Sequence, residues 1–228
     1  MKAMILAAGP GTRLRPLTDT IPKPLIEIRG APLIEHQIGW LKGAGIEDIV
    51  INVHHLADQL VDRLGNGSHL GVRITFSKEF ELLNTGGGIV NALPHLGLKP
   101  FVLLNGDVWT TYPFKRLTRH RVTHGHLVLT PVRNESNQDF ALSSEMVQRF
   151  EDSKRHNLTY CGIAIFHPLI FEQCQVEPFS LTRDLVFDLI RQQKITGEIF
   201  EGDWIDIGSP ERLSALLNSS KSSAVTDL

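Results

Sequence analysis

The first half of the chain alternates between short apolar runs and longer stretches with helical periodicity. The apolar runs have the length of buried strands and lie at residues 3–6, 48–53, 72–76 and 101–104. The helical stretches between them lie at residues 32–43, 56–64 and 85–93, the last expected to stop at Pro94. Parallel strands require crossover connections of this kind, which cover both faces of the sheet. The alternation therefore predicts an α/β fold with a doubly wound, mostly parallel sheet.

The second half of the chain is less regular, because strand-like runs follow one another with polar turns between them. These runs lie at residues 127–131, 140–142, 146–150 and 160–166. We expect them to form an antiparallel addition to the sheet. An amphipathic helix at 181–192, a strand pair near 198–200 and 204–207, and a helix at 210–217 should follow. The sequence has no internal repeat and no long linker, which favours one domain over residues 1–228 with a frayed tail at 219–228.

Composition excludes several classes of partner. The formal net charge is −2 over 228 residues, which gives no electrostatic case for binding nucleic acid or an anionic membrane. No uncharged apolar stretch reaches the roughly 18 residues of a membrane span, and no targeting segment is evident, so we expect a cytoplasmic protein. The two cysteines, Cys161 and Cys174, lack metal-ligand spacing and are expected to be reduced thiols.

Small residues follow the first apolar run and are typical of a phosphate-binding loop. Gly9 and Gly11 allow backbone N–H groups to approach a ligand closely, and Arg13 and Lys23 could neutralise phosphate charge. The loop is neither a P-loop nor a dinucleotide fingerprint, since the latter needs glycine where this chain has Leu14. A glycine-rich turn with surface arginines remains the alternative.

The fourth apolar run ends in a second polar segment, which contains Asn105 and Asp107. Ligands of doubly wound sheets bind beyond the carboxyl ends of the strands, so Asp107 and the glycine loop should lie on the same edge. Taken alone, Asp107 and the distant Asp206 are as readily turn residues as ligands.

A longer pattern resembles a known family. Residues 6–18 and 22–25 resemble the signature of the sugar nucleotidyltransferases, which join a nucleoside triphosphate to a sugar 1-phosphate and release pyrophosphate. Residues 105–109 and 204–208 resemble the family's two metal-aspartate segments. The resemblance implies a Rossmann-like nucleotidyltransferase fold with an antiparallel sugar-binding addition. It divides the chain into a nucleotide-binding half at 1–110 and a sugar- and metal-binding half at 111–218.

Within the family, three features resemble the bacterial uridylyltransferases that act on N-acetylmuramate α-1-phosphate in peptidoglycan recycling. These are the glycine segment at 85–89, residues 105–109 and the absence of an appended β-helix. The resemblance implies a Mg²⁺-dependent enzyme that uses UTP, makes UDP-N-acetylmuramate and is a monomer. A mannose 1-phosphate guanylyltransferase or a glucose 1-phosphate thymidylyltransferase is the alternative. A non-catalytic regulatory relative is disfavoured, because the charged residues of the signature are retained.

The resemblance also assigns roles to single residues. Arg13 would hold the β- and γ-phosphates and Lys23 the α-phosphate, as the catalytic pair, while Asp107 and Asp206 would bind Mg²⁺. The expected nucleotide-binding residues are Leu6, Ala8, Gly9, Gly11, Glu79, Thr85, Gly86 and Asn105. The expected sugar-binding residues are Asp139, Tyr160 and Gly162. The chain departs from the family pattern at Pro10, where a lysine is usual, at Gln138, where a glycine is expected, and at Ser209, where a threonine is usual.

Overall fold

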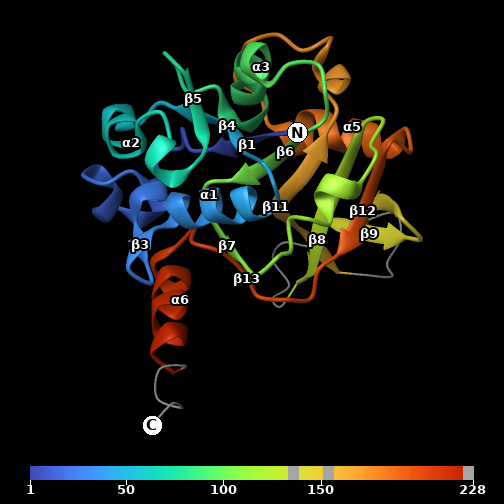
Figure 1. The fold of residues 1–228 in the computed structure, drawn as a ribbon. Helices are drawn as coiled ribbons and strands as arrows, with labels where there is room; N and C mark the ends of the chain where they lie inside the picture. Colours follow the sequence, from blue (N-terminus) through green and yellow to red (C-terminus); the bar gives the residue numbers. More distant parts are fainter. Residues whose placement is uncertain (133–138, 151–156, 223–228) are drawn as a thin grey trace.

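The computed structural model describes residues 1–132, 139–150 and 157–222, and these ranges build a mixed α/β fold around one large sheet (Figure 1). The sheet strands are β1 (Lys2–Leu6), β4 (Asp48–Val53), β5 (Arg73–Lys78), β6 (Phe101–Asn105), β8 (Gly125–Pro131), β9 (Phe140–Ser143), β10 (Met146–Arg149), β11 (Leu158–Phe166) and β12 (Ile195–Ile199). Their order is β5-β4-β1-β6-β11-β8-β12-β10-β9.

The strands of the first half are parallel, as the alternation predicted. β1 lies between β4 and β6 and is parallel to both, with Leu6 opposite Asn52 on one side and Asn105 on the other. β5 continues the parallel order beyond β4. The carboxyl ends of β1, β4 and β6 therefore meet at one edge of the sheet.

Helices cover both faces of this sheet. α1 (Leu33–Gly43) and α2 (Ala57–Leu64) pack on the face that carries Ala3 and Ile5. α3 (Asn84–Leu96) and α5 (Phe187–Arg191) pack on the other face, which carries Met4. Figure 1 shows α1 and α3 on opposite sides of β1. Successive side chains of a strand point to opposite faces, so each buried strand contributes to two apolar cores.

The second half adds antiparallel strands, as expected, with one exception. β11 is antiparallel to both β6 and β8, and β9 pairs antiparallel with β10. β12, however, is parallel to β8. The predicted strand pair near 198–200 and 204–207 is wrong, because β12 joins the main sheet. β13 (Trp204–Asp206) instead pairs with β7 (Val108–Thr110) as a separate two-stranded ribbon.

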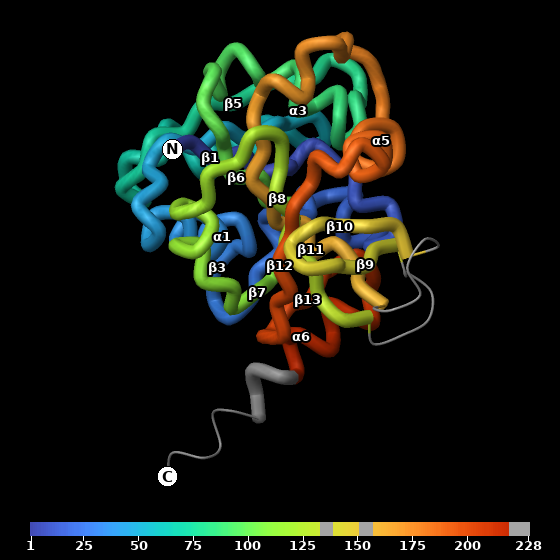
Figure 2. The backbone as a smooth tube through the Cα atoms, turned by 90° about the vertical axis from the view of Figure 1, so that its right-hand side faces the viewer, coloured from blue at the N-terminus to red at the C-terminus, as the bar shows by residue number. Residues whose placement is uncertain are grey.

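Several predicted helix boundaries also differ. α3 continues past Pro94 to Leu96, since a proline so near the end removes only one bond from the last turn. The helix expected at 181–192 starts as a π-type turn over Leu181–Val186 and becomes α-helical at α5. α6 (Pro210–Ser222) is longer than predicted and extends into the expected tail, away from the sheet (Figure 2).

Some expectations fall outside the described residues. These include Gln138, most of the polar turns near 134–139 and 152–157, and the chain after residue 222. Within the described part, no helix combines the length and the apolar character needed to cross a membrane.

Two glycines at the start of α3, Gly86 and Gly87, let a distant segment dock on the helix. Gly86 N donates to Phe179 O at 2.9 Å, and a Cβ on Gly86 would collide with the Phe179 ring. A Cβ on Gly87 would collide with the backbone oxygen of Glu177. The segment around residues 177–179 therefore lies on helix backbone that has no side chains in the way.

This docking predicts the effect of a single methyl group. Gly87→Ala should lower the free energy of unfolding by about 1–3 kcal/mol, because the colliding atom at Glu177 is backbone and the helix must move. The matched control is Gly39→Ala in α1, where a Cβ meets no atom within 4 Å and should raise stability by about 0.5–1 kcal/mol. Urea unfolding of both variants measures the difference. An equal effect of the two substitutions would contradict the docking role.

Candidate active site

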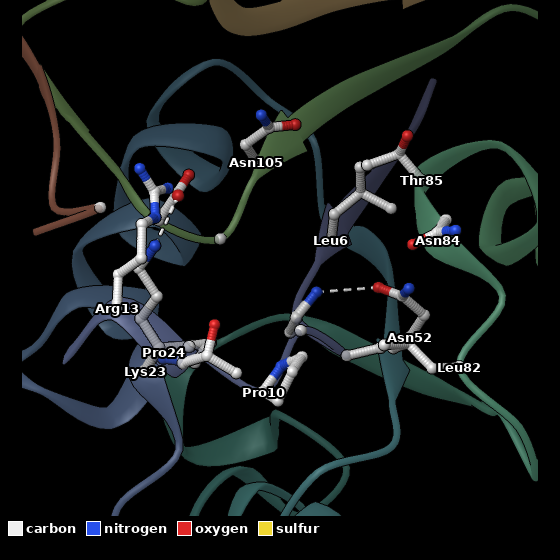
Figure 3. A pocket seen from close by; sticks show the side chains of 18 residues that line it. Leu6, Pro10, Arg13, Lys23, Pro24, Asn52, Leu82, Asn84, Thr85 and Asn105 are labelled. Atoms are coloured by element: carbon white, nitrogen blue, oxygen red, sulfur yellow. Dashed lines mark hydrogen bonds and ion pairs between the residues drawn. The ribbon is translucent and has the colours of Figure 1, made fainter. Parts of the chain in front are cut away.

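A cleft of about 310 Å³ lies beyond the carboxyl ends of β1 and β6 (Figure 3). Its walls come from segments that are far apart in the sequence. The lining residues are Leu6, Ala7, Ala8, Gly9, Pro10, Gly11, Thr12, Arg13, Lys23, Pro24, Asn52, Leu82, Asn84, Thr85, Asn105, Gly106, Asp107 and Gly208. The expected glycine loop, both expected catalytic cations and Asp107 thus share one cavity.

The loop after β1 is held by a buried chain of hydrogen bonds. Asn52 Oδ1 accepts from the backbone N–H of Ala7 at 2.8 Å, and Asn52 Nδ2 donates to Glu79 Oε1 at 2.7 Å. The other oxygen of Glu79 accepts from Leu83 N at 3.0 Å. Glu79 is 6% exposed and does not line the cleft, although it was expected to contact the nucleoside. Its contacts instead orient Asn52 and, through Asn52, the start of the loop.

A left-handed turn at Gly11 aims Arg13 along the cleft. Gly11 has φ +63°, which glycine adopts at little cost, and a Cβ there would lie 2.9 Å from Thr18 Cγ2. Thr18 Oγ1 donates to Gly11 O at 2.8 Å and fixes the turn. The next residues form a short 3₁₀ turn, Thr12–Leu14, whose buried member is Leu14. Leu14 anchors the turn, and Arg13 lines the cavity.

Lys23 reaches the cleft from a second 3₁₀ turn, Lys23–Leu25. Its Nζ lies 2.6 Å from Asp107 Oδ2, and the two side chains are 13% and 25% exposed. Pro22 and Pro24 flank the lysine and restrict its backbone. The ion pair therefore joins Lys23, from the N-terminal segment, to Asp107, which follows β6.

The ribbon of β7 and β13 brings the two expected metal aspartates together. Asp206 is opposite Val108 in the ribbon, and Ile207 N donates to Asp107 O at 2.9 Å. A Cβ on Gly208 would lie 2.7 Å from Asp206 Oδ1 and 2.8 Å from Arg13 Nη2. The absence of a side chain at Gly208 thus allows Arg13 and Asp206 to approach the same point. Asp206 lies beside the cleft, which Gly208 lines.

Asp206 is bound by a cation of its own. Arg212, in the first turns of α6, places Nη1 2.5 Å from both Asp206 oxygens. Gly208 N also donates to Asp206 Oδ1 at 3.1 Å. Each aspartate is therefore balanced by one basic side chain, Lys23 for Asp107 and Arg212 for Asp206. Two neighbouring carboxylates are the hard oxygen donors that Mg²⁺ prefers, so this donor set suits such an ion.

The remaining nucleotide-binding candidates divide into two groups. Thr85 lines the cleft, and its Oγ1 accepts from Leu181 N at 2.9 Å. Gly86 does not line the cleft and lies under the Phe179 ring. Leu6, Ala8 and Asn105 are in the wall, as expected.

The expected sugar-binding residues do not line the cleft. Gly162 comes nearest, because it has φ +69° in a bulge of β11 and a Cβ there would lie 2.8 Å from the amide of Asn105. The Tyr160 hydroxyl is buried without a hydrogen-bond partner among the described residues, and burial raises its pKa far above the ordinary value. Asp139 is exposed next to residues outside the described ranges.

Sequence reasoning missed three residues that build the site. Asn52 was recognisable as the one amide in the apolar run 48–53. Gln37 is fully buried, and its Nε2 donates at 2.9 Å to both Asn105 O and Val108 O, which fixes the turn that carries Asp107. Gln37 stands among the apolar positions of its helix, which is a visible signal. Arg212 gave no such signal, because its partner is set by tertiary structure.

Comparison with known proteins agrees with this geometry. The family model described as nucleotidyl transferase matches residues 2–222. The N-acetylmuramate alpha-1-phosphate uridylyltransferase of Neisseria meningitidis is 41% identical over 93% of this chain and 95% of its own length. The mannose-1-phosphate guanyltransferase of Saccharomyces cerevisiae is 36% identical over 92% of this chain, which spans 62% of that protein.

A solved structure shows the same fold. A putative glucose-1-phosphate thymidylyltransferase from Bacillus anthracis superposes with a TM-score of 0.83 over 97% of this chain and 95% of that chain, at 20% identity. The family match covers nearly the whole chain. The chain belongs to the nucleotidyl transferase family, and the two relatives described above are named for transfer to sugar phosphates.

Proposed function

We propose that this protein is a uridylyltransferase that transfers UMP from UTP to N-acetylmuramate α-1-phosphate, giving UDP-N-acetylmuramate and pyrophosphate in peptidoglycan recycling. The observation that carries the reaction class is the cleft shared by the glycine loop, Arg13, Lys23 and Asp107. The choice of UTP and of the muramate substrate rests on the relative that is 41% identical over almost its full length.

The proposed chemistry is the attack of a sugar phosphate oxygen on the α-phosphate of the triphosphate. A bond forms between this oxygen and the α-phosphorus, and the bond from the α-phosphorus to the leaving pyrophosphate breaks. Both reactants are anions, so the first barrier is electrostatic repulsion. Protein groups lower such a barrier by positioning the reactants and by balancing charge.

The residues of the cleft can divide this task. The backbone N–H groups near Gly9 and Gly11 would hold phosphate oxygens, and Arg13 would hold the two phosphates that leave. Lys23 would leave Asp107 in part and donate to the α-phosphate, where negative charge develops. The ion pair with Asp107 holds the Lys23 side chain in the cleft.

Asp107 and Asp206 are the residues that would hold Mg²⁺. The ion would supply positive charge to the phosphates of both substrates. Arg212 donates to both oxygens of Asp206 and would compete with the ion for them. Arg212 therefore acts as a built-in counter-ion for Asp206.

Release of pyrophosphate tests the proposed substrates. The protein with Mg²⁺ is incubated with UTP, GTP, dTTP or ATP, each crossed with muramate, glucosamine, glucose and mannose 1-phosphates. We expect release to be fastest with UTP and N-acetylmuramate α-1-phosphate. Faster release of pyrophosphate with GTP and mannose 1-phosphate would contradict the proposed substrates and indicate the guanylyltransferase activity for which the yeast relative is named. No release from any pair would contradict nucleotidyl transfer itself.

Replacement of Lys23 tests its place in the reaction. Lys23→Ala should lower kcat by about 10²–10³-fold, the range found when one stabilising donor is lost, and should leave the fold intact. Lys99→Ala, at an exposed position outside the cleft, is the control and should retain full activity. Steady-state kinetics and circular dichroism measure the two effects. Unchanged turnover in a folded Lys23→Ala variant would rule out the assigned role.

Replacement of Arg212 tests the competition for Asp206. Arg212→Ala should tighten binding of Mn²⁺, as a paramagnetic substitute for Mg²⁺, by about 2- to 5-fold, because a partly exposed ion pair is worth about 1 kcal/mol or less. The control is Arg191→Ala, which removes an exposed ion pair to Asp188 in α5. Electron paramagnetic resonance of free Mn²⁺ reports the affinity without any turnover. Equal affinity in both variants would show that Arg212 does not compete with the ion.

A further inference from the structure

Two histidines and a glutamate gather outside the cleft, in the second half of the sheet. His120 follows a short 3₁₀ turn, Leu117–Arg119, while His126 belongs to β8 and Glu198 to β12. One potential ligand atom from each lies within 4.8 Å of the others. The imidazole rings of His120 and His126 stack at 4.1 Å. None of the three residues lines the candidate active site.

His126 presents a buried nitrogen without a partner. The residue is 3% exposed, and its Nε2 has no hydrogen-bond partner among the described residues. A buried polar atom that lacks a partner is costly unless something binds it.

The hydrogen bonds around His126 fix which nitrogen carries the proton. Nδ1 lies 2.9 Å from Thr196 Oγ1, and the Thr196 hydroxyl donates to Gly125 O at 3.3 Å. Because the hydroxyl proton is used on Gly125, Thr196 accepts from Nδ1–H. Nε2 then carries a free lone pair, as in histidines that bind metals through Nε2.

Glu198 is held in the same way that ligating carboxylates are held. Its side chain is 13% exposed, Tyr112 donates to Oε1, and Arg116 Nη2 donates to Oε2 at 2.5 Å. Each oxygen keeps a second lone pair, and a metal ion would compete with Arg116 for Oε2 as it would compete with Arg212 for Asp206. His120 and Glu198 are half-buried, whereas His126 is buried.

We propose that His120, His126 and Glu198 form a zinc site distinct from the candidate active site. Two imidazole nitrogens and one carboxylate oxygen are a ligand set that Zn²⁺ accepts, with water as the fourth ligand. Ligand atoms around tetrahedral zinc lie about 3.3 Å apart and those of the cluster lie within 4.8 Å of one another, so the cluster must contract by up to about 1.5 Å. Rotation of the His120 side chain out of its stack with His126 would have to supply this movement. The bound ion would fix residues 117–120 to strands β8 and β12.

Metal titration of the full chain tests the site. Calorimetry with Zn²⁺ in excess Mg²⁺, which saturates oxygen-only sites, should show one Zn²⁺ bound per chain. Co²⁺ should give the visible absorption bands of a tetrahedral nitrogen and oxygen site. His126→Gln should weaken binding by more than about 100-fold, and Thr196→Val, which frees Nδ1, by about 10-fold. His124→Gln removes a neighbouring histidine outside the cluster and should change nothing.

Two results would contradict the proposed zinc site. Absence of Zn²⁺ binding and of the Co²⁺ bands in the unaltered protein overturns the proposal without any variant. Equal Zn²⁺ affinity in the unaltered protein, Thr196→Val and a folded His126→Gln also overturns it. These readouts do not involve turnover, so they are independent of the proposed reaction.

Discussion

The pairing of β1 with β6 is the interaction on which the candidate site depends. Leu6 and Asn105 are opposite each other in parallel register, and Gly106 N donates to Leu6 O at 2.9 Å just beyond the strand ends. A Cβ on Gly106 would lie 2.5 Å from Leu6 O, so a side chain there would separate the two strand ends. This close approach places the glycine loop beside Asp107. The remaining lining residues of the cleft surround these two strand ends.

Charge balance is the second principle of the site. Lys23 is paired with Asp107 and Arg212 with Asp206, so each of the two carboxylates is balanced by one basic side chain. Substrate phosphates and a metal ion would exchange these partners rather than enter an unbalanced site. Short 3₁₀ turns position Arg13 and Lys23, and α6 positions Arg212. This arrangement limits the side-chain rearrangement required when ligands bind.

The sequence predicted the parts of the molecule that follow from local pattern. Apolar runs and helical periodicity gave the parallel half of the sheet, because each strand there is buried on both faces and followed by a helix. The signature of the first 25 residues gave Arg13, Lys23 and the loop. A strand near 204–207 was predicted, but β7 and its pairing with β13 were missed, since the two segments are separated by about ninety residues and no local pattern indicates that they pair. The structural contacts of Gly86 and Glu79 were not foreseen, because helix docking and a buried hydrogen bond to Asn52 arise only in tertiary structure.

A crystal structure with Mg²⁺ and a non-hydrolysable UTP analogue tests the central claim most directly. The triphosphate should lie in the cleft between Gly9–Gly11 and Asp107, with Arg13 on the terminal phosphates, Lys23 on the α-phosphate and the ion on Asp107 and Asp206. Arg212 should have released Asp206. A triphosphate bound outside this cleft, or one that contacts neither Arg13 nor Lys23, would contradict the proposed site.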